Sequence, residues 1–342
     1  MFRKEILMIV VALAGLCPVR AVEYYITDIG TLGSHPESNA YGINDYGQVV
    51  GYSGTVRGPE EGRRAFLWDT TAGMQNLGTL GGNHSEAYGI NDAGQVVGRS
   101  TLPSGEADVR GFLWEGGSMI DLGTFDGGWT EAKGINNSHQ IVGYSVLSSS
   151  VAAFSWEDDS MTNLGSLGDN SRGYGINDAG LIVGHCFDST SFNTTASLWD
   201  NGDITSLGSL GSHYNYAWGI NNSGQIVGES GSHAFLWENE SDGMIDLGIG
   251  SAVAINDAGQ IVGRSGGTAC LWENGIIRNL DDLLLAGSGW ELQEATAINN
   301  FGQIVGNGMI NGEIHAYLLT PVPEPGTLAL LGLGAIVIRK RK

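Results

Sequence analysis

The stretch Ala87 to Gly98, AYGINDAGQVVG, decides the fold because it recurs along the chain. Every copy contains an Asn that follows Ile and precedes Asp or Asn, at Asn44, Asn91, Asn136, Asn177, Asn221, Asn256 and Asn299. Every copy then runs on to a Val-Gly pair, at Gly51, Gly98, Gly143, Gly184, Gly228, Gly263 and Gly306. The seven copies lie 35 to 47 residues apart, a spacing typical of repeat proteins.

Two further patterns recur in step with the first. One is an apolar run that ends in Trp, such as Ala65 to Trp68, and the other is a Leu-Gly segment, such as Asn76 to Gly81. Each repeat therefore holds four short apolar segments bounded by Gly, Asn, Asp or Ser, which is typical of strands joined by tight turns. In the turn of the opening stretch, Asn91 can accept hydrogen bonds from its own turn, and Gly94 can adopt positive φ.

Four strands per unit of about 45 residues is the period of a β-propeller blade. The sequence therefore predicts an all-β, seven-bladed propeller over residues 22–320. The chain ends favour closure: a lone Leu-Gly segment, Tyr24 to Gly33, precedes the repeats, and the seventh repeat stops near Leu319 without one. If this segment is each blade's outermost strand, the N-terminal copy completes the last blade. An open β-solenoid is the alternative, but it does not predict complementary partial repeats.

The first 21 residues predict a signal peptide. Arg3 and Lys4 form a charged region, Ile6 to Leu16 an apolar run, and Val19-Arg20-Ala21 a small-residue cleavage site. We therefore expect the mature chain to start near Val22.

Residues 321–342 form a separate terminal segment. Pro321 to Pro325 interrupts the strand pattern, Gly326 to Ile338 gives thirteen apolar residues, and Arg339 to Lys342 is basic. A membrane span needs about 20 apolar residues, so this run predicts a short and transient transmembrane helix with its basic end in the cytoplasm. We expect cleavage of the tail after export, and a permanent short anchor is the alternative.

Val322-Pro323-Glu324-Pro325-Gly326, with the apolar run and basic end, closely resembles the PEP-CTERM sorting domain of Gram-negative bacteria that produce exopolysaccharide. The resemblance implies recognition by an exosortase, a membrane protease, with Pro323, Glu324 and Pro325 as the recognised motif. It also implies export to the cell envelope, cell surface or extracellular matrix.

The repeats resemble the HAF family of extracellular repeats, named for a His-Ala-Phe strand. His233-Ala234-Phe235 matches in full, whereas Arg64-Ala65-Phe66 departs from the pattern at its first residue. This resemblance implies no catalytic activity.

The charge is strongly acidic. The 342 residues carry a formal charge of −21, and between leader and tail nine Lys or Arg face thirty-five Asp or Glu, about −26. Such a surface repels nucleic acid and anionic lipid, so we expect no nucleic-acid partner and membrane contact only through the C-terminal segment.

Sequence motifs for catalysis are missing. The chain has no HExxH and no P-loop, and it has no clustered metal-ligand spacing. We therefore expect a protein that is not an enzyme and that needs no cofactor or metal.

The repeats differ most in the strand that precedes the Asn, which we expect to be innermost. The position before its Gly or Ala holds Tyr41, Tyr88, Lys133, Tyr174 and Trp218, and the position two residues earlier holds Glu86 and Glu131. Strand alternation places both positions on one face. Packing of the aromatics between blades is the favoured interpretation. The alternative is a polar and aromatic mouth of the channel that holds a sugar or a cation.

Three functional hypotheses follow. The first is a non-enzymatic exported protein of the cell surface or matrix. The second is a binding module for extracellular polysaccharide or a protein partner. The third is a propeller glycosidase or lyase, for which Glu86 and Glu131 would have to lie about 5 to 10 Å apart.

Overall fold

Each copy of the repeated stretch forms two antiparallel strands and a tight turn. In the second repeat these are β6 (Ser85–Ile90) and β7 (Val96–Leu102). The side-chain oxygen of Asn91 accepts hydrogen bonds from the amides of Ala93 and Gln95 at 3.1 and 3.0 Å, and Gly94 has φ +77°. The predicted role of Asn and Gly in this turn is confirmed.

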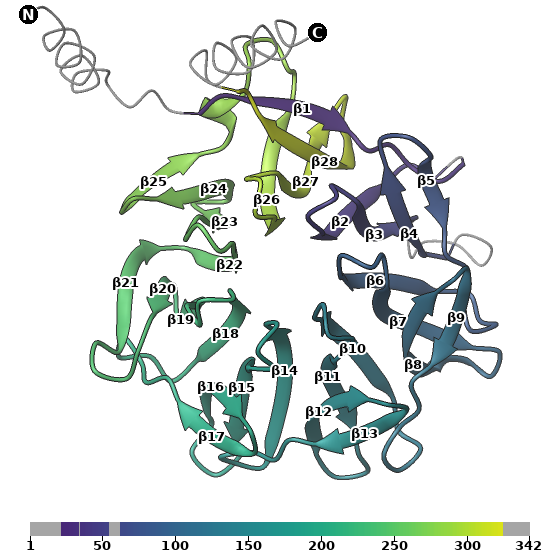
Figure 1. Ribbon diagram of the computed structural model, residues 1–342, viewed down its shortest axis with the longest axis vertical. Coiled ribbons are helices and arrows are strands. Elements are labelled where there is room, and N and C mark those ends of the chain that lie inside the picture. The colour runs from purple at the N-terminus through teal and green to yellow at the C-terminus, as the bar shows by residue number, and fades with distance from the viewer. Residues whose placement is uncertain (1–21, 34, 55–61, 324–342) are drawn as a thin grey trace, which may run out of the picture.

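The computed structural model describes residues 22–33, 35–54 and 62–323. Within these ranges the strands form seven four-stranded sheets arranged round one axis (Figure 1). Blade I consists of β2 (Ser38–Ile43), β3 (Val49–Ser53), β4 (Arg64–Asp69) and β5 (Gly73–Asn76). Blade II consists of β6, β7, β8 (Gly105–Glu115) and β9 (Ser118–Asp121). Blade III consists of β10 (Thr130–Ile135), β11 (Ile141–Val146), β12 (Val151–Glu157) and β13 (Ser160–Asn163).

The remaining blades follow the same order. Blade IV consists of β14 (Asn170–Ile176), β15 (Ile182–Asp188), β16 (Asn193–Asp200) and β17 (Asp203–Ser206). Blade V consists of β18 (Asn215–Ile220), β19 (Ile226–Ser230), β20 (His233–Trp237) and β21 (Met244–Ile249). Blade VI consists of β22 (Ser251–Ile255), β23 (Ile261–Ser265), β24 (Thr268–Glu273) and β25 (Ile276–Asn279). Blade VII is β26 (Glu291–Ile298), β27 (Ile304–Ile310), β28 (Glu313–Pro321) and β1 (Tyr24–Asp28), and a 3-10 turn, η1 (Asp281–Leu283), precedes it.

The N-terminal strand closes the ring. β1 pairs antiparallel with β28, from Tyr24 opposite Pro321 to Asp28 opposite Tyr317. Tyr24 is 1% exposed, and the amide of Val322 donates to the carbonyl of Glu23 at 2.8 Å. The predicted seven-bladed propeller closed by its N-terminal strand is confirmed, and the chain enters and leaves the propeller at the same edge of blade VII.

The sequence predicted that the Leu-Gly segment is each blade's outermost strand, and this is wrong for most blades, although β21 of blade V does include the shortened copy Asp246 to Ile249. In blade I the outermost strand is β5, which ends at Asn76, where the Leu-Gly segment begins. Leu77 is buried after it, and Gly78 has φ +82°, which bends the chain away from the strand and towards the next blade. The outermost strand itself is partly to fully exposed, so it carries no apolar signature.

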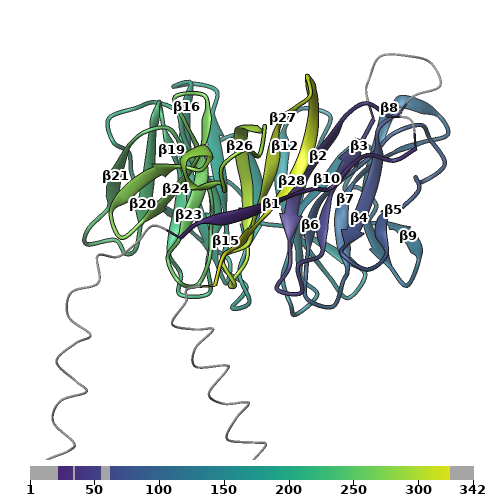
Figure 2. The same cartoon turned by 90° about the horizontal axis from the view of Figure 1, so that it is seen from above.

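The core consists of the layers between neighbouring blades. Phe112 and Trp114 of blade II, for example, pack on Val50 and Leu67 of blade I. In the edge-on view of Figure 2 the blades stand side by side, with strands running between the two faces of the ring. The face with the seven Asn turns is called the Asn face below.

The recurring Asn residues join all seven blades on the Asn face. Each side-chain amide donates to the main-chain carbonyl of the corresponding Asn in the next blade, at 3.0 to 3.1 Å, and Asn299 completes the ring with Asn44. The next residue forms a second ring, in which each main-chain amide donates to a side-chain oxygen of the following blade at 2.8 to 3.0 Å. The repeated Asn-Asp/Asn pair therefore fixes the blades to one another as well as shaping each turn.

Candidate functional site

The predicted residues that precede the Gly of the innermost strands sit at β-bulges. The register of β6 and β7 shifts between Ala87 and Gly89, and the extra residue is Tyr88. The same shift occurs in the other four blades concerned, where the extra residues are Tyr41, Lys133, Tyr174 and Trp218. A bulged residue has no cross-strand partner, so its side chain is free to reach the neighbouring blade.

These residues contact one another from blade to blade. The rings of Tyr41 and Tyr88 lie 5.5 Å apart, and those of Tyr174 and Trp218 lie 4.7 Å apart. The Lys133 ammonium group lies 3.6 Å from the centre of the Tyr88 ring. The structure thus brings the predicted residues together in two groups, and all five are partly buried. These contacts match the interpretation of aromatic packing between blades.

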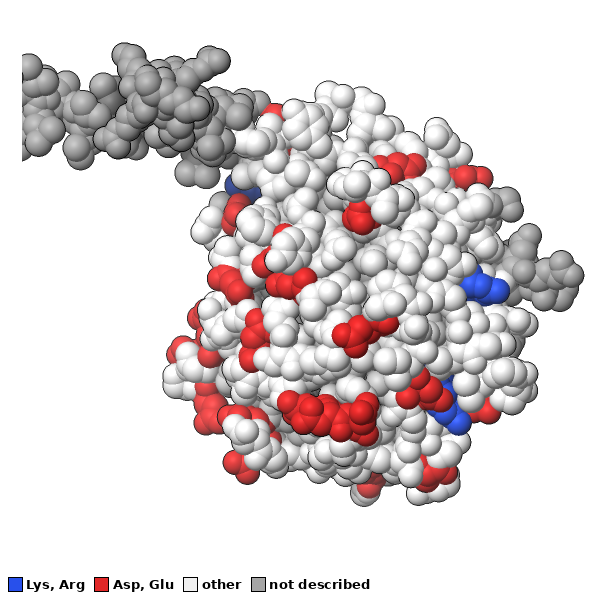
Figure 3. Space-filling model, turned by 45° about the vertical axis from the view of Figure 1, so that its right-hand side comes forward, with Lys and Arg blue, Asp and Glu red and all other residues white. Residues whose placement is uncertain are grey.

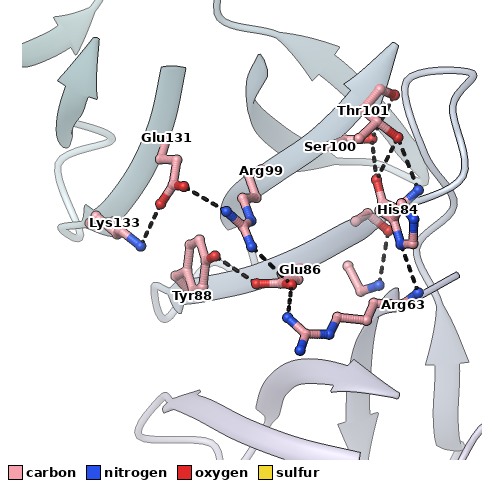
Figure 4. Close-up of polar contacts among 11 residues, drawn as sticks. Arg63, His84, Glu86, Tyr88, Arg99, Ser100, Thr101, Glu131 and Lys133 are labelled. Atoms are coloured by element: carbon pink, nitrogen blue, oxygen red, sulfur yellow. Dashed lines mark hydrogen bonds and ion pairs between the residues drawn. The ribbon is translucent and has the colours of Figure 1, made fainter. Parts of the chain in front are cut away.

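Charged side chains extend the first group into a network across blades I to III (Figure 4). Arg99 bridges the two predicted carboxylates, at 3.1 Å from Glu86 and 2.8 Å from Glu131. Arg63 pairs with Glu86 at 2.5 Å, and Lys133 pairs with Glu131 at 2.6 Å. The Tyr88 hydroxyl donates to Glu86 at 2.7 Å. Glu86 and Glu131 are therefore satisfied although they are only 5% and 3% exposed.

Both carboxyl groups are held in the charged form. Burial on its own raises the pKa of Glu86, but the guanidinium groups of Arg99 and Arg63 outweigh it and hold this pKa below its ordinary value. Burial likewise raises the pKa of Glu131, and Lys133 and Arg99 bring it below the ordinary value. The pKa of Lys133 is lowered by burial, an effect that Glu131 opposes.

This network predicts acid sensitivity. Because the folded pKa values of Glu86 and Glu131 are depressed, their contribution is complete above the unfolded value of about 4.3 and is lost as the pH falls through the folded values. Glu131→Gln should destabilise the protein by about 2 kcal/mol at neutral pH. This loss is smaller than the loss on breaking a fully buried ion pair, because the side chains of Arg99 and Lys133 are partly exposed and solvent screens their charges. It should also flatten the loss of stability below about pH 4.

Urea unfolding across a pH series measures both effects. The exposed Glu240→Gln is the matched control, since it removes the same charge from a surface position. A Glu131→Gln variant with the stability and acid slope of the wild type would contradict the network.

A cavity of about 230 Å³ lies beside the network, between blades I and II. It is lined by Arg63, His84, Ser85, Glu86, Arg99, Ser100, Thr101 and Val109. The side chains of Arg63 and Arg99 are 26% and 33% exposed, so both are partly exposed at the cavity while their guanidinium groups are anchored to Glu86. We call this cavity and the network the Arg-Glu site.

Sequence reasoning missed Arg63 and Arg99. Arg99 follows the repeated Val-Gly pair, and in the sheet it lies directly opposite Glu86. The residue after Val-Gly varies among the repeats, as Tyr52, Arg99, Tyr144, His185, Glu229, Arg264 and Asn307. Variation at a fixed place in the motif was the signal that could have identified Arg99.

Basic residues are few on this protein. On the side shown in Figure 3, acidic side chains are scattered over the surface and basic ones are sparse. The described part of the chain holds eight Lys or Arg, and three of them are Arg63, Arg99 and Lys133. A fourth, Arg172, lies nearby, with its guanidinium carbon 4.7 Å from the centre of the Tyr144 ring in blade III. Half of these basic residues therefore gather on the inner strands of blades I to IV or beside them.

Neither metal ligation nor a membrane span was found in the ranges that the structure covers. Among residues 22–33, 35–54 and 62–323 no group of three His, Cys, Asp or Glu side chains is placed to hold a metal ion. In the same ranges no helix is long and apolar enough to cross a membrane.

Residues 321–342 match the family model of the PEP-CTERM protein-sorting motif. The chain carries a PEP-CTERM sorting motif. This motif implies an exported protein of the cell envelope that is sorted by an exosortase. Pro323, exposed two residues after the end of β28, is the last described residue. Glu324 and Pro325 lie outside the described residues, as do the predicted signal peptide and the apolar run at 326–338. The resemblance to HAF repeats stays a prediction.

None of the curated proteins compared with the chain matches it. Among solved structures, the β-propeller domain of the Trilobed protease from Pyrococcus furiosus is similar, with TM-score 0.54, 10% identity and coverage of 84% of this chain and 94% of that one. A chain of the Mitotic Checkpoint Complex has TM-score 0.52 and 12% identity, with 88% and 95% covered. TolB from Acinetobacter baumannii has TM-score 0.40 and 14% identity; 63% of this chain covers 59% of TolB.

The likenesses to the Pyrococcus propeller and to the checkpoint chain show the fold alone. The Pyrococcus propeller is described as having an open velcro topology, whereas here β1 pairs with β28 and closes the ring. The PEP-CTERM motif therefore follows a closed propeller, directly after its closing pair of strands.

Proposed function

We propose that this exosortase-sorted propeller is a non-enzymatic binding module for an acidic extracellular polysaccharide, which it holds at the Arg-Glu site. The observation that carries the proposal is the presence of Arg63 and Arg99 at one cavity, with Lys133 in the same network, in a protein of formal charge −21. A basic site within an acidic surface attracts anionic groups locally while the rest of the surface repels them.

The geometry of the site suits a uronate. Guanidinium groups bind carboxylates with paired, charge-assisted hydrogen bonds, and Arg63 and Arg99 are exposed in part at the cavity. Their contacts with Glu86 fix both side chains in place before a ligand arrives, which reduces the entropy lost on binding. Ser100 and Thr101 on the cavity wall add hydroxyl groups that can bond to sugar hydroxyls.

The same geometry disfavours glycosidase chemistry. Acid-base cleavage of a glycosidic bond needs one carboxylic acid with a raised pKa beside a second carboxylate. The pKa values of Glu86 and Glu131 are both lowered, and Arg99 lies between the two groups and pairs with each. Binding without turnover is therefore the activity that these residues support.

Calorimetry with tri-galacturonate tests the proposal. Arg63→Gln should weaken binding about tenfold, because it removes one charge-assisted contact worth about 1.4 kcal/mol. Glu86 keeps its bond to Arg99 in this variant, so we expect the fold to remain intact, with a melting temperature close to that of the wild type.

Arg278→Gln is the matched control, since it removes the same charge from β25 of blade VI, away from the site. Tri-galacturonate binding that is equally strong in Arg63→Gln and wild type would refute the proposed site. Equal weakening in both variants would show that only the overall charge matters.

A further inference from the structure

The strands that carry the chain into and out of the propeller meet at the Asn face. β27 begins at Ile304, directly after the Asn turn of blade VII, and Leu319 of β28 lies opposite Ile304. Two residues further on, Pro321 pairs with Tyr24 at the start of β1. The chain therefore leaves the propeller towards the sorting motif from the Asn face of blade VII.

The sorting motif follows the propeller directly. The match to the PEP-CTERM model begins at Pro321, which is still part of β28, and the amide of Val322 is bonded to the carbonyl of Glu23. The apolar run that the sequence predicts to enter a membrane begins at residue 326, so the chain from Pro321 to this run spans at most about 18 Å when fully extended. An exosortase is a membrane protease, so the Asn face of blade VII has to approach the bilayer while the motif is processed.

Exposed aromatic side chains mark this part of the Asn face. The third residue of the Asn turn is Ala or Ser in blades II to VI, but it is Tyr46 in blade I and Phe301 in blade VII. These two residues are 77% and 69% exposed, and Tyr25 of β1, one residue after the partner of Pro321, is 53% exposed. We call Tyr25, Tyr46 and Phe301 the aromatic edge.

The Asn turns of blades VII and I are joined to each other and to the end of β28. The main-chain amide and the side-chain amide of Asn300 both donate to the carboxylate of Asp45, at 2.9 and 3.0 Å. A Cβ at Gly302 would lie 3.4 Å from Cγ of Pro321. The aromatic edge therefore lies beside the point where the chain leaves the propeller.

Acidic hairpins lie across the ring on the same face. The hairpin between the third and fourth strands of a blade is at the Asn face, because its Trp pairs with the first residue of the second strand, as Trp156 does with Ile141. Blade I has Asp69 alone at this hairpin, and in blade VII the chain leaves instead. Blades III and V each have three acidic residues there, namely Glu157, Asp158 and Asp159, and Glu238, Glu240 and Asp242. The aromatic edge is thus on the side of the Asn face where the hairpins are least repelled by an anionic surface.

We propose that the aromatic edge is a membrane-docking surface, which lies in the headgroup layer of a zwitterionic bilayer while the sorting motif is engaged. Tyr side chains favour the boundary between headgroups and hydrocarbon, and binding at this boundary grows with the apolar area that leaves water. The surface shares no residue with the Arg-Glu site and does not depend on an acidic polysaccharide.

Flotation of the full-length protein with phosphatidylcholine vesicles tests the proposal. Tyr46→Ala combined with Phe301→Ala restores the residue of blades II, IV and VI, so we expect this double variant to keep the fold and the melting temperature of the wild type. It should bind the vesicles at least about tenfold more weakly.

Phe192→Ala combined with Tyr214→Ala is the matched control. Phe192 lies in the turn from β15 to β16 and Tyr214 directly precedes β18, so both are at the face opposite the Asn turns, and they are 68% and 55% exposed. This variant removes two exposed aromatic side chains as well, and its vesicle binding should equal that of the wild type.

Wild-type protein that does not bind the vesicles would overturn the proposal, as would equal binding by the wild type and the Tyr46→Ala/Phe301→Ala variant, or equal weakening in the two double variants. Binding to phosphatidylglycerol vesicles that is as strong as binding to phosphatidylcholine would reject the preference for a zwitterionic surface. Slower processing of the Tyr46→Ala/Phe301→Ala variant in a host with an exosortase, with unchanged vesicle binding, would assign the aromatic edge to the protease instead.

Discussion

Deleting β1 is expected to destabilise the propeller by more than about 5 kcal/mol and to cause aggregation. The deletion of Tyr24–Asp28 removes the outermost strand of blade VII and leaves the edge of β28 unpaired. It also removes Tyr24, which packs with Leu271, Leu280 and Leu319 in the core between blades VI and VII. Loss of one such large buried side chain alone costs about 3 to 5 kcal/mol.

Thermal unfolding and light scattering of the full-length chain without these residues measure the effect. Two single substitutions separate burial from pairing. Tyr24→Ala should destabilise strongly, and Tyr25→Ala, whose side chain is 53% exposed, should change stability little. A deletion variant that stays monomeric with an unchanged melting temperature would show that β1 does not close the ring.

Gly98→Ala is expected to prevent folding or to destabilise the protein by about 3 kcal/mol or more. Gly98 is the repeated Gly of the Val-Gly pair, and a Cβ there would overlap the main-chain carbonyl oxygen of Glu86 on the neighbouring strand. Backbone cannot rotate away as a side chain can, so the inner strand of blade II would have to shift. Overpacking of this kind usually costs about 1 to 3 kcal/mol, and contact with backbone places it at the upper end.

Gly111→Ala in the adjacent strand is the control, because its Cβ would lie 3.2 Å from the nearest atom, the amide nitrogen of Ala132. Chemical denaturation of both variants measures the difference. Equal stability of Gly98→Ala and Gly111→Ala would show that close approach of the strands does not explain the repeated Gly.

The number of blades could be predicted from the sequence because each blade repeats a buried signature. The runs that end in residues such as Trp68 and Trp114 are fully or nearly buried, and their apolar character is visible in every copy. The outermost strand could not be placed from the sequence, since the side chains of Gly73–Asn76 are partly or fully exposed to solvent and show no apolar pattern. The sequence therefore predicts the strand at the apolar Leu77 that follows it, which is wrong.

Half of the Arg-Glu site could be predicted in the same way. Glu86, Glu131 and Lys133 stand out as departures from a repeated strand, and the structure brings them together. Arg99 could not be paired with Glu86 without the strand register, and Arg63 directly precedes β4 of another blade. The contacts of the bulged residues also depend on how closely neighbouring blades approach, which no single repeat specifies.

The Asn rings show the same limit. The turn-capping bonds of Asn91 are local and were predicted, but its amide donates to the carbonyl of Asn136 in the next blade. That bond exists only in an assembled ring, and the seventh one, from Asn299 to Asn44, exists only when the ring closes. A repeated residue can thus serve its own turn and the assembly at once.

Comparison of tri-galacturonate with its methyl ester, on the full-length wild-type protein at one low salt concentration, tests the central claim of an acidic-sugar site most directly. Methylation removes the carboxylate charges and leaves the sugar ring and its hydroxyl groups in place. Since Arg63 and Arg99 are the exposed cations at the cavity, we predict binding of the acid and an affinity for the ester that is at least about tenfold lower. Equal affinity for the two forms, or absence of heat with both, would contradict an acidic-sugar site.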